Sequence, residues 1–146
     1  MTDRVLVPVD GSPLSHAALR HALETFQNAR IVVYHVVNIF EPGYELDETS
    51  VRELLSGSGE WDAMEQEAAD HLLSEAERIA SEYEREIVTD SDLGDPRRLI
   101  PEYAGDNDVD HIVLGVHGRA EEERALVGQV AETVVFRSPV PVTVIR

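Results

Sequence analysis

Short apolar runs alternate along the chain with segments whose apolar residues recur every three or four positions. The runs are rich in valine, isoleucine and leucine, as is typical of strands that are buried on both faces of a parallel sheet. They predict five strands, over Arg4 to Val9, Ile31 to Val37, Glu86 to Thr89, Val109 to Leu114 and Val140 to Ile145.

The periodic segments predict amphipathic helices, each with an apolar stripe facing the core. Local signals mark two of their starts, because Ser12-Pro13 and Asp95-Pro96 each pair an N-cap residue with a first-turn proline. The predicted helices begin near Ser12, Trp61, Asp95 and Val127 and end near Phe26, Tyr83, Tyr103 and Val135. The polar stretch from Asn38 to Glu60 is predicted to be a long connection.

This alternation predicts an α/β fold with a five-stranded, mainly parallel, doubly wound sheet and four helices. We expect residues 1–146 to form a single domain. In such sheets a ligand binds at the carboxyl ends of the strands, where the winding reverses. If the first and fourth strands flank that reversal, Asp10 lies beside the loop that begins at Gly115.

The loop after the fourth strand contains Gly115, Gly118 and Gly128, the last of which opens a helix. Glycines at a strand end, followed by a helix N-terminus, favour a phosphate cradle of backbone N–H groups. The alternative is that these glycines only punctuate turns. Asp10 could accept hydrogen bonds from a ribose hydroxyl or an adenine amine, or could be a turn residue before Gly11.

Composition narrows the possible partners. The chain has 29 acidic and 12 basic residues, a net charge of −17, no cysteine and no lysine. The charge disfavours nucleic acid and anionic membranes as partners, and a Walker phosphate loop would require a lysine. Without an export signal at the start of this sequence, we expect a cytoplasmic protein. The acidic, lysine-free composition resembles that of proteins from extreme halophiles; the alternative is an ordinary acidic protein.

Taken together, these motifs resemble the universal stress protein family, in its single-domain, nucleotide-binding form. The resemblance spans essentially the whole chain and is carried by Val5 to Ser12, His35-Val36-Val37, Gly94-Asp95-Pro96, the spacing G-x-x-G-x9-G and Pro139 to Val142. It implies the adenine nucleotide alpha hydrolase-like version of the doubly wound fold. It also implies that Asp10 and the backbone near Val9 hold adenosine and that Val36 lines the adenine.

By the same resemblance, the glycine loop surrounds the triphosphate of ATP, and Mg²⁺ would be brought by the nucleotide. The full nucleotide-binding set that it implies is Pro8, Val9, Asp10, Val36, Leu114, Gly115, His117, Gly118, Arg119, Gly128, Gln129 and Val130. The implied function is an ATP-binding stress-response regulator without catalytic residues. The apolar last strand, with Val140, Val142 and Val144, is the expected homodimer contact.

Two departures keep other functions open. Gln129 stands where nucleotide-binding members usually carry serine or threonine, and Glu121 to Glu123 add negative charge to the loop. The chain could therefore be a dimeric interaction module that has lost nucleotide binding. A slow ATP-hydrolysing enzyme, with His117 as its base, is a further alternative.

Overall fold

The computed structural model describes residues 2–37, 59–116 and 129–146, without the side chains of residues 59–66 and 68. In this part of the chain, five parallel strands form one sheet in the order β3-β2-β1-β4-β5. The strands are β1 (Arg4–Pro8), β2 (Arg30–Val37), β3 (Val88–Leu93), β4 (His111–Gly115) and β5 (Val142–Ile145). The helices are α1 (Pro13–Thr25), α3 (Gly59–Glu82), α4 (Pro96–Asp106) and α5 (Gln129–Arg137). The predicted α/β fold is confirmed.

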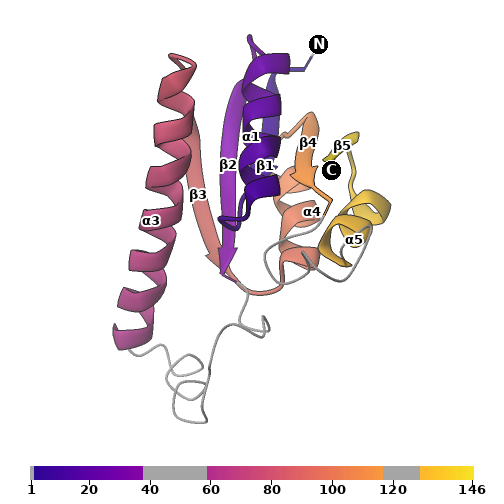
Figure 1. Ribbon diagram of the computed structural model, residues 1–146. Coiled ribbons are helices and arrows are strands. Elements are labelled where there is room, and N and C mark those ends of the chain that lie inside the picture. The colour runs from indigo at the N-terminus through magenta and orange to yellow at the C-terminus, as the bar shows by residue number, and fades with distance from the viewer. Residues whose placement is uncertain (1, 38–58, 117–128) are drawn as a thin grey trace.

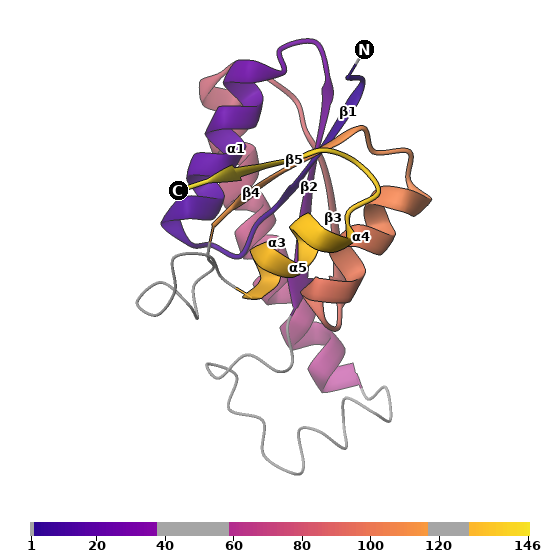
Figure 2. The same cartoon turned by 90° about the vertical axis from the view of Figure 1, so that its right-hand side faces the viewer.

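The helices form two layers, with α1 and α3 on one face of the sheet and α4 and α5 on the other (Figures 1 and 2). Successive residues of the central strands point to opposite layers. On β1, Val5 and Val7 pack beneath α1 and α3, whereas Leu6 packs beneath α4 and α5. Because both faces are covered, the central strands have the continuous apolar runs seen in the sequence. None of the described helices is both long and apolar enough to span a bilayer.

The predicted extent of the third strand was wrong. The sequence predicted Glu86 to Thr89, but β3 runs from Val88 to Leu93 and includes the exposed Asp90 and Asp92. The strand lies at the edge of the sheet and pairs with β2 alone, so its register extends from Val32↔Val88 to Val37↔Leu93 without needing an apolar pattern. Edge strands commonly carry charges that discourage further pairing.

Several predicted ends were also shifted. α4 continues three residues past Tyr103, and β4 starts at His111 rather than at Val109. Asp108, which has a left-handed φ of 54°, lies between the helix and the strand. β5 begins at Val142 rather than Val140.

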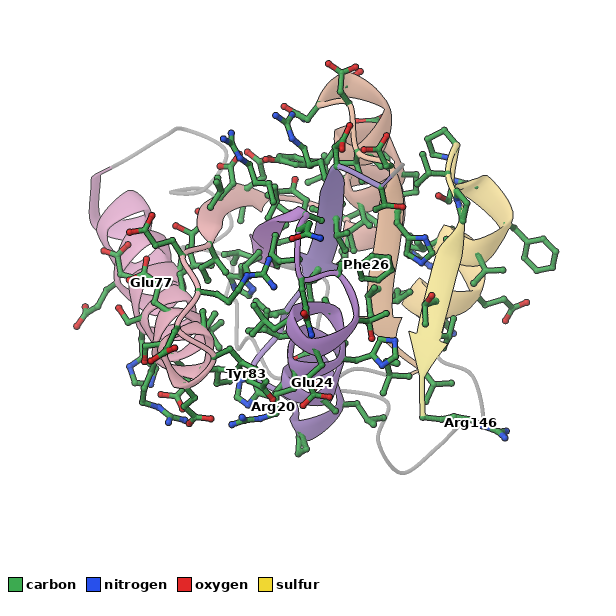
Figure 3. The ribbon with its side chains drawn as sticks, turned by 90° about the horizontal axis from the view of Figure 1, so that it is seen from above. Arg20, Glu24, Phe26, Glu77, Tyr83 and Arg146 are labelled. Atoms are coloured by element: carbon green, nitrogen blue, oxygen red, sulfur yellow. The ribbon has the colours of Figure 1, made fainter. Side chains whose placement is uncertain are left out.

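Polar contacts join α1 and α3 at the end of the molecule away from the carboxyl ends of the strands. Arg20 lies 2.6 Å from Glu82, and the Tyr83 hydroxyl donates to Glu24 at 2.8 Å. Figure 3 shows Arg20, Glu24 and Tyr83 close together there. Just beyond α3, Arg85 donates to the carbonyls of Leu23, Phe26 and Ala29 at 2.9, 3.3 and 2.7 Å and so caps the C-terminus of α1.

Candidate nucleotide site

The winding of the sheet reverses between β1 and β4, an arrangement that the sequence allowed. These strands are neighbours, with Leu6 beside Ile112, and the chain continues outward from them in opposite directions, to β2 on one side and β5 on the other. The carboxyl ends of β1 and β4 therefore lie together, and α1 and α5 leave from them on opposite faces of the sheet. This is where doubly wound sheets bind ligands.

A tight turn follows β1. The Asp10 Oδ1 atom accepts from the backbone N–H of Ser12 at 2.9 Å, and Gly11 between them has a φ of +83°. Ser12 then caps α1, since its Oγ accepts from the N–H of Ser15 at 3.2 Å. Asp10 therefore acts as a turn residue, which was the alternative to ligand binding, and its contact with a ribose hydroxyl stays a prediction.

Gly115, at the end of β4, has a packing reason to be glycine. A Cβ atom there would lie 2.9 Å from Leu14 Cβ and 3.1 Å from the Leu14 carbonyl carbon, in the first turn of α1. The missing side chain lets α1 approach β4 closely. Leu114 is buried beneath α4 and α5 in the same cluster as Val36.

At the end of β2, Val36 points toward the layer of α4 and α5 and is 9% exposed. The preceding residue, His35, is buried, and its Nδ1 lies 2.9 Å from the carbonyl oxygen of Val9. Pro8 pairs with Tyr34 one register position earlier. The implied adenosine residues of β1 and β2 are therefore brought together on adjacent strands.

Helix N-termini also gather at this edge, where their dipoles favour an anion. α5 begins at Gln129, which is exposed, and Val130 packs against the cluster that contains Leu114. Asp95 caps α4, and its hydrogen bonds with Arg97 hold the pKa of the Asp95 carboxyl below its ordinary value.

Much of the predicted glycine loop lies outside the described residues. This applies to His117, Gly118, Arg119, Gly128 and the acidic run Glu121 to Glu123. In the part of the chain that the structure describes, no group of three or more acidic or histidine side chains could hold a metal ion.

Sequence reasoning missed a pair of tyrosines beside Val36. The Tyr34 hydroxyl donates to Asp92 at 2.6 Å and the Tyr103 hydroxyl donates to Asp90 at 3.1 Å, with the two rings stacked 4.3 Å apart. Burial, followed by the hydrogen bond to Asp90, raises the pKa of Tyr103 to about 12, and burial also raises the pKa of Tyr34. The alternation of Asp90 and Asp92 was the available signal, since it places both on one face of β3.

Comparison of this chain with known proteins identifies similar proteins of one family. The model of the universal stress protein family matches residues 1–146. A universal stress protein of Methanocaldococcus jannaschii is 30% identical, with 98% of this chain and 81% of that protein covered. The structure of a universal stress protein from Lactobacillus plantarum has a TM-score of 0.77 and 29% identity, covering 99% of this chain and 98% of that one.

Among more distant structures with the same fold, one is an Arabidopsis thaliana universal stress family protein with AMP bound. It is 18% identical, with a TM-score of 0.66, and 98% of this chain and 90% of that chain are covered. Another is the universal stress protein of Archaeoglobus fulgidus in complex with dAMP, at 20% identity and a TM-score of 0.59, covering 100% of this chain and 98% of that one.

Proposed function

The chain belongs to the universal stress protein family, and we propose that it binds an adenine nucleotide, ATP in particular, as a cytoplasmic stress-response regulator. The observation that carries this proposal is the meeting of β1 and β4 at the reversal of the sheet, where the ends of both strands adjoin the start of a helix. Relatives that share the fold hold AMP and dAMP.

In the proposed complex, adenosine lies against the end of β1 and Val36, and the phosphates lie near the N-terminus of α5. Backbone N–H groups and the helix dipole supply most of the attraction for the phosphates, because the chain is strongly acidic and has no lysine. The divalent ion, Mg²⁺, is carried by the phosphates and water.

The first test is titration calorimetry with ATP, ADP and AMP on the wild type and two matched variants. Asp10→Asn removes one charge but keeps the Oδ1 acceptor that holds the turn to Ser12. Glu77→Gln removes one charge from an exposed position on α3 (Figure 3). If Asp10 accepts from the ribose, Asp10→Asn weakens binding about tenfold, whereas Glu77→Gln binds as the wild type does.

Failure of the wild type to bind any of the three nucleotides would overturn the proposal, and equal affinity of Asp10→Asn and the wild type would remove Asp10 from the site. Mass spectrometry of the denatured, freshly purified protein gives an independent check. Recovery of ATP supports a regulator, whereas conversion of added ATP to ADP or AMP, lost on His117→Ala, favours slow hydrolysis.

A second candidate function is a dimeric interaction module, and the exposed apolar surface around β5 favours it. β5 is the last strand of the sheet, and Val135 and Phe136, in the preceding helix, are 46% and 81% exposed. Edge strands with apolar side chains invite pairing with a second copy. We propose a homodimer through this strand, near Val140, Val142 and Val144. Light scattering in molar salt should give the dimer mass, and a monomer at micromolar concentration would contradict it.

A further inference from the structure

The hydrogen-bond ladder between β1 and β2 stops one step early. The N–H of Val9 donates to the Tyr34 carbonyl at 2.9 Å, as it should in a parallel pair. The next ladder bond would run from the N–H of Val36 to the carbonyl of Val9. In the described residues that carbonyl instead accepts from Nδ1 of His35, at 2.9 Å, and strand pairing ends at Pro8↔Tyr34.

The replacement leaves the peptide groups of Val36 directed at the place where β1 has ended. Backbone groups of successive strand residues alternate in direction. The Tyr34 carbonyl faces β1, and the Val37 carbonyl faces the opposite side, where it accepts from the N–H of Gly94 at 3.0 Å. The N–H and carbonyl of Val36 therefore face the β1 side. Within the described part of the chain, no hydrogen bond joins them to β1.

His35 offsets the energetic cost of this early ending, because it supplies the hydrogen-bond donor that the Val9 carbonyl would otherwise lack. A buried carbonyl without a donor is costly. His35 is 4% exposed, and its neighbour Val33 packs beneath α1 and α3, so the imidazole approaches Val9 from that layer. Since a carbonyl only accepts, Nδ1 must carry a hydrogen atom.

We propose that His35 is a positioning residue for base recognition. Its Nδ1–H donates to the Val9 carbonyl in place of the Val36 N–H, and the Val36 peptide is thereby left to bind the edge of the base. This inference rests on the proposed nucleotide site. One donor and one acceptor on the same side of Val36 suit adenine, which presents an acceptor ring nitrogen beside its N6 amine. Hypoxanthine has an oxygen in place of that amine, so its base would leave the Val36 carbonyl without a donor.

Three substitutions separate this role from a structural one. His35→Asn keeps a donor near the Nδ1 position, His35→Gln moves the donor to the Nε2 distance, and His35→Leu removes it. The measurement is the ratio of the dissociation constants for ITP and ATP, after circular dichroism has shown that each variant is folded. We expect a ratio of about ten or more for the wild type and His35→Asn, and a ratio near one for His35→Leu and His35→Gln.

The ratio distinguishes failure of this inference from failure of the proposed function. If the wild type binds neither nucleotide, the proposed function falls and the inference falls with it. If the wild type prefers ATP and His35→Leu keeps that preference, the nucleotide site stands and the role of His35 is overturned. A loss of stability alone would not change the ratio.

Amide hydrogen exchange of the wild type tests the same inference without any variant. In the free protein, the Val36 amide should exchange faster than the Tyr34 amide on the same strand, and ATP should slow it by about tenfold or more. Val36 protection equal to that of Tyr34 before ATP is added would show that the ladder continues, and would overturn the inference.

Discussion

Gly115→Ala provides the most direct test of how the candidate site is built. The new Cβ would lie 2.9 Å from Leu14 Cβ, 3.1 Å from the Leu14 carbonyl carbon and 3.2 Å from its oxygen. Ordinary carbon contacts begin at about 3.5 Å, so the first turn of α1 would have to move by about 0.6 Å. Rotation of the Leu14 side chain cannot relieve contacts with backbone atoms.

The expected cost follows from that displacement. Overpacking of this kind costs about 1–3 kcal/mol. Replacing glycine also restricts the unfolded chain, which returns about 0.4–1 kcal/mol. The free energy of unfolding of Gly115→Ala should therefore fall by about 1–2 kcal/mol.

Gly105→Ala is the matched control. Gly105 is exposed in α4, and a Cβ there would meet only Pro139 Cγ, at an ordinary 3.9 Å. Because glycine is unfavourable in a helix, the free energy of unfolding of Gly105→Ala should rise by about 0.5–1 kcal/mol. Urea unfolding followed by circular dichroism measures both variants. Equal stability of Gly115→Ala and the wild type would show that α1 is free to shift, and would remove the packing reason for this glycine.

Three further predictions concern side chains with defined contacts. Arg85→Ala should lower the free energy of unfolding by about 2–3 kcal/mol, because the Leu23 and Phe26 carbonyls at the end of α1 and the Ala29 carbonyl before β2 lose a charged donor. Arg98→Ala, which breaks an exposed ion pair, should change the free energy of unfolding by less than about 1 kcal/mol. Equal effects of the two substitutions in urea unfolding would refute the capping role. Burial lowers the pKa of His111, and a nearby histidine lowers it further. The contribution of His111 to the free energy of unfolding should therefore be fully present above about pH 6.5 and be lost as the pH falls toward the pKa of His111 in the folded protein. His111→Gln should flatten this pH dependence, and an NMR titration that gives His111 an ordinary pKa would contradict it. The pKa values of Tyr34 and Tyr103 are raised in the folded protein. Their contribution to the free energy of unfolding should therefore be fully present below about pH 10 and fall above it, because these tyrosines lose their protons first in the unfolded chain. Ultraviolet titration should show both phenols ionising late, and a normal titration would count against their burial.

Local signals in the sequence predicted the features that depend on a few consecutive residues. Ser12-Pro13 and Asp95-Pro96 start helices as expected, because a capping side chain bonds to an N–H only two or three residues away. The central strands were equally readable, since a strand covered on both faces must be apolar throughout. The order of the elements allowed a reversal between β1 and β4 without requiring it, and the strand order of the sheet establishes it.

The extent of β3 required the tertiary structure. An edge strand takes its register from its neighbour and leaves one side to solvent, so Asp90 and Asp92 can lie within it without an apolar pattern. The resemblance to universal stress proteins supplied the implied ligand contacts, which no periodicity in the chain could have indicated. Nucleotide titration tests those contacts.

What the sequence determined by itself was the set of elements, their order and hence the edge of the sheet where the carboxyl ends of the strands meet, because these depend on local pattern and chain connectivity. Only the tertiary structure decided why particular residues stand there. Gly115 is required by Leu14, about a hundred positions earlier, and the donor for the Val9 carbonyl comes from His35 on the next strand. Such contacts are set when separate elements pack together, and close packing leaves no trace in the residues on either side of them.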